Sequence, residues 1–178
     1  MIKKIVLPLA LVMFITSEVD AQTNINQKDK NGKKTGLWIE NGMYGLEEAY
    51  YQDGKYNGFY RSYSKVNKSR LSSFGSYLNG KMSGDWYFID DKSHVYMSCE
   101  DIKPNKDLFV NGEDNKKVMP SSKAYVRVYH DNGKVEQEGL AIFDSVEIEF
   151  YGIGKWVFRD ENGKVIETKN FYKPTLMD

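Results

Sequence analysis

The sequence predicts an all-β fold, an elongated antiparallel meander of repeated β-hairpins with little helix outside a signal peptide. Three observations favour this class. Asn-Gly and Asp-Gly steps, the strongest short-range signal for tight hairpin turns, recur along the chain. Between them, apolar and polar residues alternate with a period of two, as in strands that bury one face. A short motif also repeats, which indicates a repeat architecture.

Composition narrows the class of protein further. The chain of 178 residues carries 25 Lys or Arg and 25 Asp or Glu, so its formal net charge is zero. Nucleic-acid binders normally show a basic excess, and anionic headgroups attract basic segments, so neither nucleic acid nor a membrane is expected as a partner. The single cysteine, Cys99, excludes a disulfide scaffold; we expect it either to be buried or to pair between chains.

Residues 1–21 have the composition of a secretory signal peptide. A short basic start precedes an uncharged apolar stretch from Ile5 to Ile15, and cleavage is expected after Ala21. This apolar stretch is too short for a transmembrane helix, which needs about 20 residues. Residues 22–178 are predicted to form one domain of an exported protein, either periplasmic or extracellular.

The exported part repeats the pattern Asn/Asp-Gly-Lys-x-x-Gly-x-Trp/Tyr. Its copies are Asn31–Trp38, Asp53–Tyr60 and Asn79–Trp86, and Gly154-Lys155-Trp156 keeps the end of a fourth copy. A second element recurs out of phase, because Trp156–Glu167 aligns with Trp86–Met97, in which Lys92-Ser93-His94-Val95 occupies the turn. The expected turn glycines of the repeats are Gly32, Gly54, Gly80, Gly133 and Gly163.

Hairpin chemistry explains the Asn-Gly steps. They begin at Asn31, Asn41, Asn57, Asn79, Asn111, Asn132 and Asn162, and Asp53-Gly54 is equivalent. A two-residue type I′ turn needs positive φ at both central residues, which Asn, Asp and Gly tolerate best. We therefore expect a tight turn at each of these steps.

The alternation predicts which side chains share a face of the sheet. Trp86 and Phe88 are expected opposite to Tyr87 and Ile89. The same period appears in 125–129, where valines alternate with Tyr and Arg, and in 146–151. No segment after the signal peptide shows a stripe with a period of 3.6 residues, so little helix is expected.

Two units, residues 49–60 and 75–86, resemble MORN-type repeats, and are closest to the bacterial variant found in YwqK-family antitoxins. The similarity covers residues 31–89 and 125–172 and is interrupted by an irregular insertion near 90–123. The resemblance implies a solenoid in which each repeat is one hairpin stacked on its neighbours.

The resemblance also implies a ladder of aromatic residues along one face. Its members are Trp38, Tyr60, Trp86 and Trp156. Cross-strand aromatic pairs are a usual stabilising unit of sheets, so we expect these rings mainly to pack the repeats together. The alternative is that they form an aromatic binding face.

Residues that could carry catalysis are sparse. The acids Asp90, Asp91, Glu100 and Asp101 could act in pairs or bind calcium, but no Asp-x-Asp-x-Asp-Gly loop is present. His94 and His130 fall at turns, and with one cysteine they make a zinc site improbable. We therefore predict no catalytic residue, no metal site and no cofactor.

Three functional hypotheses follow. The first is an exported, non-catalytic repeat module that binds or scaffolds a protein or a polysaccharide. The second is an immunity or antitoxin-like protein that neutralises a toxin, which only the family resemblance suggests. The third is a hydrolase whose acids lie in the 90–123 insertion, because long irregular segments often carry function.

Overall fold

The computed structural model describes residues 25–42, 45–111, 117–144 and 149–176. This part of the chain consists of strands and turns and contains no helix, which confirms the predicted all-β class. The predicted signal peptide, residues 1–21, and residues 146–148 of the predicted alternation lie outside the described residues.

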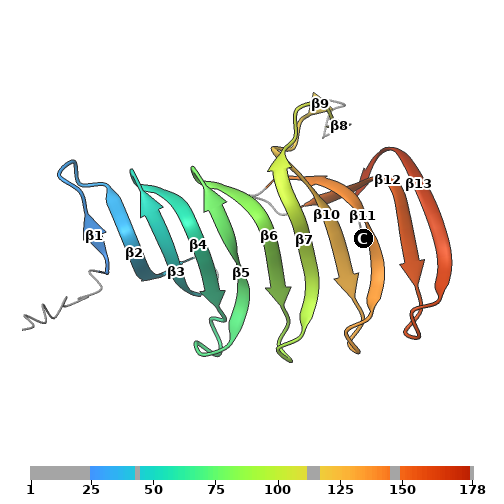
Figure 1. The fold of residues 1–178 in the computed structure, drawn as a ribbon, viewed down its shortest axis with the longest axis horizontal. Coiled ribbons are helices and arrows are strands. Elements are labelled where there is room, and N and C mark those ends of the chain that lie inside the picture. The colour runs from blue at the N-terminus through green and yellow to red at the C-terminus, as the bar shows by residue number, and fades with distance from the viewer. Residues whose placement is uncertain (1–24, 43–44, 112–116, 145–148, 177–178) are drawn as a thin grey trace, which may run out of the picture.

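Eleven strands form one antiparallel meander (Figure 1). In their order across the sheet they are β1 (Gln27–Lys28), β2 (Lys34–Asn41), β3 (Leu46–Gln52), β4 (Lys55–Tyr63), β5 (Leu71–Leu78), β6 (Lys81–Ile89), β7 (Val95–Pro104), β10 (Ser122–Tyr129), β11 (Val135–Phe143), β12 (Phe150–Arg159) and β13 (Val165–Leu176). Each strand pairs with its neighbours in the chain, except that β10 follows β7 in the sheet.

The predicted insertion at 90–123 is narrower than expected. Residues 90–94 form an ordinary hairpin turn, and β7 stays paired with β6 as far as Ile102 and with β10 as far as Pro104. The irregular part begins only at Asn105 and contains β8 (Val110–Asn111) and β9 (Lys117–Val118), which pair with each other in a small separate sheet. Figure 1 shows this excursion beyond the ends of β7 and β10.

The hairpins use two kinds of turn, where the sequence predicted one. At Asp53-Gly54 and Asn79-Gly80 both residues have positive φ, as a type I′ turn requires. In the turns at Gly32, Gly133 and Gly163, only the glycine has a positive φ. The glycine N–H donates to the carbonyl of the residue three positions earlier. These are three-residue loops ending in a left-handed residue.

Not every Asn-Gly step is a turn. Asn57-Gly58 lies inside β4, where Gly58 has a φ of 126°, so the expectation of a turn there is wrong. Gly58, Gly84 and Gly154 each stand two residues before the aromatic residue of their repeat, and each coincides with a shift in strand register. These repeat glycines are therefore positions of β-bulges, which bend a strand and increase its twist.

The strands curve toward the face that carries the core. Lys34 and Glu40 lie six residues apart on β2, which would separate them by about 20 Å in a straight strand. Their side chains nevertheless meet, with 2.5 Å between Lys34 Nζ and Glu40 Oε1. The face to which both side chains belong is therefore concave, and the opposite face is convex.

The main hydrophobic cluster occupies this concave face. Its buried members are Ala49, Tyr51, Tyr60, Met82, Trp86, Phe88, Cys99, Ile102, Ala124, Val126, Ala141, Phe143 and Trp156. Trp86 and Phe88 belong to it, whereas Tyr87 lies on the convex face beside Phe74, which confirms the predicted alternation in β6.

Candidate functional site

The four aromatic residues of the expected ladder lie in one row on the concave face. Cross-strand pairing connects Trp38 to Ala49, Tyr60 and Gly75, and connects Trp86 to Cys99, Val126, Gly139 and Trp156. We call these nine residues the concave row. Trp86 and Trp156 are 2% and 0% exposed, Tyr60 is 7% exposed, and Trp38 is half-buried.

Two tryptophans of this row cover glycines of the preceding strand. A Cβ atom on Gly75 would lie 2.3 Å from the Trp86 ring, and one on Gly139 would lie 2.5 Å from the Trp156 ring. The indole N–H of each ring donates to a backbone carbonyl one residue further along, at 2.9 Å to Ser76 and 2.8 Å to Leu140. Both rings are thus held flat against the sheet and hydrogen-bonded within it.

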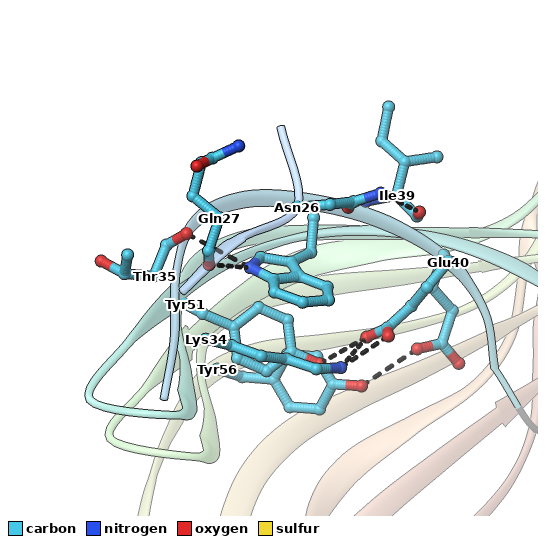
Figure 2. A network of polar contacts seen from close by, with 10 residues as sticks. Asn26, Gln27, Lys34, Thr35, Ile39, Glu40, Tyr51 and Tyr56 are labelled. Carbon is cyan, nitrogen blue, oxygen red and sulfur yellow. Dashed lines mark hydrogen bonds and ion pairs between the residues drawn. The ribbon is translucent and has the colours of Figure 1, made fainter. Parts of the chain in front are cut away.

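At the N-terminal end the concave face carries a network of polar contacts (Figure 2). The Trp38 indole donates to the Gln27 carbonyl at 3.0 Å, so β1 covers this end of the row. Lys34 Nζ lies 4.5 Å from the centre of the Trp38 ring and 4.8 Å from that of Tyr51. Glu40 accepts hydrogen bonds from both Lys34 Nζ and the Tyr51 hydroxyl, so the lysine is held between two rings and a carboxylate.

A cluster of tyrosines continues the network along the concave face. Tyr56 stacks on Tyr77 with 4.8 Å between ring centres, and its hydroxyl donates to Glu47, which is 6% exposed. Burial raises the pKa of Tyr51, Tyr56, Tyr60 and Tyr77, so these phenols stay protonated at neutral pH. The concave face is filled by its own side chains.

Cys99 is completely buried in this row, between Trp86 and Val126. Burial raises the pKa of its thiol to about 12. A thiol that is protonated and inaccessible is a poor nucleophile and a poor partner for a disulfide. Of the two expectations for this residue, the structure supports the buried one.

The candidate acids do not converge. Asp90 caps its own turn by accepting the backbone N–H groups of Lys92 and His94. It precedes β7, whereas Glu100 and Asp101 lie near the other end of that strand, where Asp101 forms an ion pair with Lys103.

The turn residues show no clustering either. Asp91 is exposed, and His130 donates one hydrogen bond from its ring Nε2 to the Arg159 carbonyl. Across the described ranges, no three His, Cys, Asp or Glu side chains are grouped to hold a metal ion. The same ranges contain no helix of the length and apolarity needed to cross a membrane.

A different cluster of aromatic rings lies on the convex face. It consists of Tyr50, Phe59, Phe74 and Tyr87, together with the guanidinium of Arg61, and we call it the convex aromatic patch. Tyr50, Phe59 and Phe74 are 42%, 39% and 37% exposed. This patch was not predicted from the sequence, although its signal is present: in β4 and β6, aromatic residues occupy both alternating positions.

The patch surrounds a shallow groove between β4 and β5. The groove has a volume of about 320 Å³ and is lined by Phe59, Tyr60, Arg61, Leu71, Phe74 and Gly75. Phe59 meets Tyr50 edge-on at 5.3 Å, and Phe74 stacks on Tyr87 at 4.9 Å, so one aromatic pair stands on each side. Arg61 stands between these pairs, paired with Glu48 across the strands and 5.5 Å from the Phe59 ring centre. The groove therefore combines apolar rings with a charged pair.

The same face has a different character in the C-terminal half. Arg127 pairs there with Glu100 and Glu138, and Arg159 Nη1 lies 2.6 Å from Glu138. Burial alone would raise the pKa of Glu138, but hydrogen bonds from Arg127 and Arg159 outweigh it and hold the pKa below its ordinary value. On this half of the convex face, these arginines and glutamates therefore pair with one another.

Comparisons of the chain with protein-family models, with curated proteins and with solved structures found no match. The resemblance to MORN-type repeats therefore stays a prediction. What the structure shows by itself is a curved sheet with a filled concave face and a convex face that carries exposed rings at its N-terminal half.

Proposed function

We propose that the protein is a non-catalytic binding module that holds a polysaccharide on the convex aromatic patch. The observation that carries the proposal is the groove between Phe59 and Phe74, with exposed rings on both sides and Arg61 between them. Contiguous apolar surface of this kind on a soluble protein usually marks an interaction site. The predicted signal peptide would deliver the module to the periplasm or the outside of the cell.

The chemistry of the patch suits sugars. The face of an aromatic ring carries partial negative charge and attracts the C–H groups on the flat side of a pyranose. Arg61 and Glu48 supply donors and acceptors that hydroxyl groups can bridge. A sugar ring lying across the groove would meet both kinds of contact at once.

The charge of the site favours an uncharged glycan. Arg61 is already paired with Glu48, so the patch offers no unbalanced cation to an acidic polymer. The chain as a whole has zero formal charge and gives no long-range attraction to a polyanion. A neutral polysaccharide therefore fits better than an acidic one.

The shape of the site favours a long polymer over a small metabolite. The groove opens onto a sheet surface rather than closing around a ligand, whereas small-molecule sites bury most of their ligand. The row of rings from Tyr50 to Tyr87 crosses four neighbouring strands, β3 to β6. Several sugar units could contact this row in succession.

Affinity electrophoresis in gels containing soluble neutral polysaccharides tests the proposal. The wild-type protein should be retarded by at least one of them, and Phe59→Ser/Phe74→Ser should run as in a gel without polysaccharide. The matched control is Leu140→Ser, which removes an exposed apolar side chain from β11 and should leave the retardation unchanged.

Two outcomes would contradict the proposal. Retardation that persists in the double variant would exclude the patch as the site. A wild-type protein that no polysaccharide retards, but that captures a protein in a crosslinked pull-down through Phe59 and Phe74, would make the ligand a protein. Circular dichroism would confirm that each variant is folded before either result is interpreted.

A further inference from the structure

The two edges of the large sheet differ in length. At one edge lies β1, with only two residues, and at the other lies β13, with twelve. Among the described residues, residues 167–171 of β13 pair with β12 alone, so no second strand of the described chain is paired with the outer side of this stretch. An edge of this length is a template for another strand unless its sequence opposes pairing.

The first part of β13 is regular enough to serve as such a template. Residues 167–171 pair with β12 one for one, without a register shift. Side chains from Val165 to Asn170 are exposed, with Val165 and Ile166 at 50% and 65%. Pro174, which lacks a backbone N–H, lies beyond this stretch and leaves it intact.

The sequence of this stretch is complementary to itself. When two copies of β13 run antiparallel with Thr168 of each at the centre, Glu167 of one copy lies opposite Lys169 of the other, twice. The register of β13 shifts before Glu167, so the complementary contacts of the regular stretch are these two ion pairs. Opposite charges that face each other across strands stabilise a sheet.

The faces of the sheet also agree in this arrangement. Within one chain, Lys169 pairs with Trp156, which belongs to the core, and Glu167 pairs with Phe158, which packs against it. Both charged side chains therefore lie on the concave face of the sheet. Lys169 Nζ lies 3.4 Å from Glu167 in the same chain, and both side chains are about half exposed. In the dimer, Glu167 and Lys169 of both copies would lie together on the concave face of the interface.

We infer that two copies of the protein associate through β13, in a two-fold antiparallel pair that joins their sheets into one. The two-fold axis would be perpendicular to the sheet, because residues on the concave face of one copy pair with residues on the concave face of the other. Both convex aromatic patches would then open to the same side of the joined sheet. A polymer with repeated units could contact both, which raises the apparent affinity without new contacts.

Sedimentation velocity across a concentration series tests the association. The wild-type protein should form a dimer, and Lys169→Glu should weaken it roughly tenfold or more, because Glu167 of each copy then faces a carboxylate instead of an ammonium group. Glu167→Lys/Lys169→Glu restores opposite charges and should restore the dimer. Lys81→Glu makes the same change of charge on an exposed side chain of β6 and should leave association unchanged.

A mixture provides a second readout. Lys169→Glu has two acids in the paired stretch and Glu167→Lys has two lysines. Each variant alone should therefore dimerise weakly, and the two together should form a mixed dimer about as tight as the wild-type dimer. A monomeric wild-type protein, or a dimer indifferent to these charge changes, would overturn the inference. Folding of each variant is checked by circular dichroism, so loss of the dimer is not mistaken for unfolding.

Discussion

One row of residues on the convex face differs between the two halves of the molecule. Across β3 to β6 it contains the Glu48–Arg61 pair followed by Phe74 and Tyr87, and across β7 to β12 it continues with Ser98, Arg127, Glu138 and Val157. The Phe74 ring of the first part is exposed, whereas Arg127 and Glu138 of the second part form an ion pair with each other.

The concave row does not differ in this way. Trp86 covers Gly75 in the N-terminal half as Trp156 covers Gly139 in the C-terminal half, with the same hydrogen bond from the indole. The repeat thus determines the concave positions, because ring and glycine must fit together. Convex positions are under no such constraint, and there the halves have diverged.

The largest expected loss of stability comes from adding a side chain to a glycine that a tryptophan ring covers. Gly139→Val and Gly75→Val should each lower the free energy of unfolding by about 3 kcal/mol or more, since the added side chain would overlap the indole ring and force it from its place. Urea denaturation measures both. Similar losses in the two halves support a shared role of the concave row, and a mild effect in either half would break the comparison.

A smaller effect is expected from the convex ion pairs of the C-terminal half. Glu138→Gln should cost about 1 to 2 kcal/mol at pH 7, because two arginines lose a charged partner. Ionised Glu138 has a lowered pKa, so its contribution is complete above the ordinary value of 4.5 and is lost as the pH falls through the folded value.

The difference in stability between wild type and Glu138→Gln should therefore shrink below about pH 4. Thermal melting at several pH values measures it. Phe74→Ser, on the same row in the other half, should cost less and show no such pH dependence. A pH-independent loss for Glu138→Gln would mean that the charge network does not stabilise this half.

The smallest expected change in stability concerns the turn between β6 and β7, which connects the two halves of the sheet. Ser93 has a φ of 68° in the hairpin between β6 and β7, a position that Gly32, Gly133 and Gly163 occupy in the equivalent turns. Ser93→Gly should raise the free energy of unfolding by about 0.5 to 1 kcal/mol, because it relieves a left-handed backbone at some cost in chain entropy. Chemical denaturation would detect it, and a destabilised variant would refute the turn assignment.

Much of the fold could be predicted because it depends on local chemistry. Asn79-Gly80 forms its type I′ turn, and the alternation in β6 separates Trp86 from Tyr87 as expected. Ser93 takes the place of a turn glycine, as the alignment of repeats required. Turns and period-two alternation need only neighbouring residues, so one sequence is enough to find them.

The curvature of the sheet could not be predicted in the same way. Alternation divides side chains between two faces but does not say which face is concave, since that depends on bulges at Gly58, Gly84 and Gly154. An Asn-Gly step in a bulge has the same sequence as one in a turn, which explains the error at Asn57-Gly58. The convex aromatic patch was missed for this reason.

Urea denaturation of Trp86→Ala and Tyr87→Ala tests most directly whether the concave face stabilises the molecule and leaves the convex face free to bind. The two residues are neighbours on β6 and point to opposite faces. We predict that Trp86→Ala lowers the free energy of unfolding by about 3 to 5 kcal/mol and Tyr87→Ala by less than about 1 kcal/mol. Losses of equal size would contradict it.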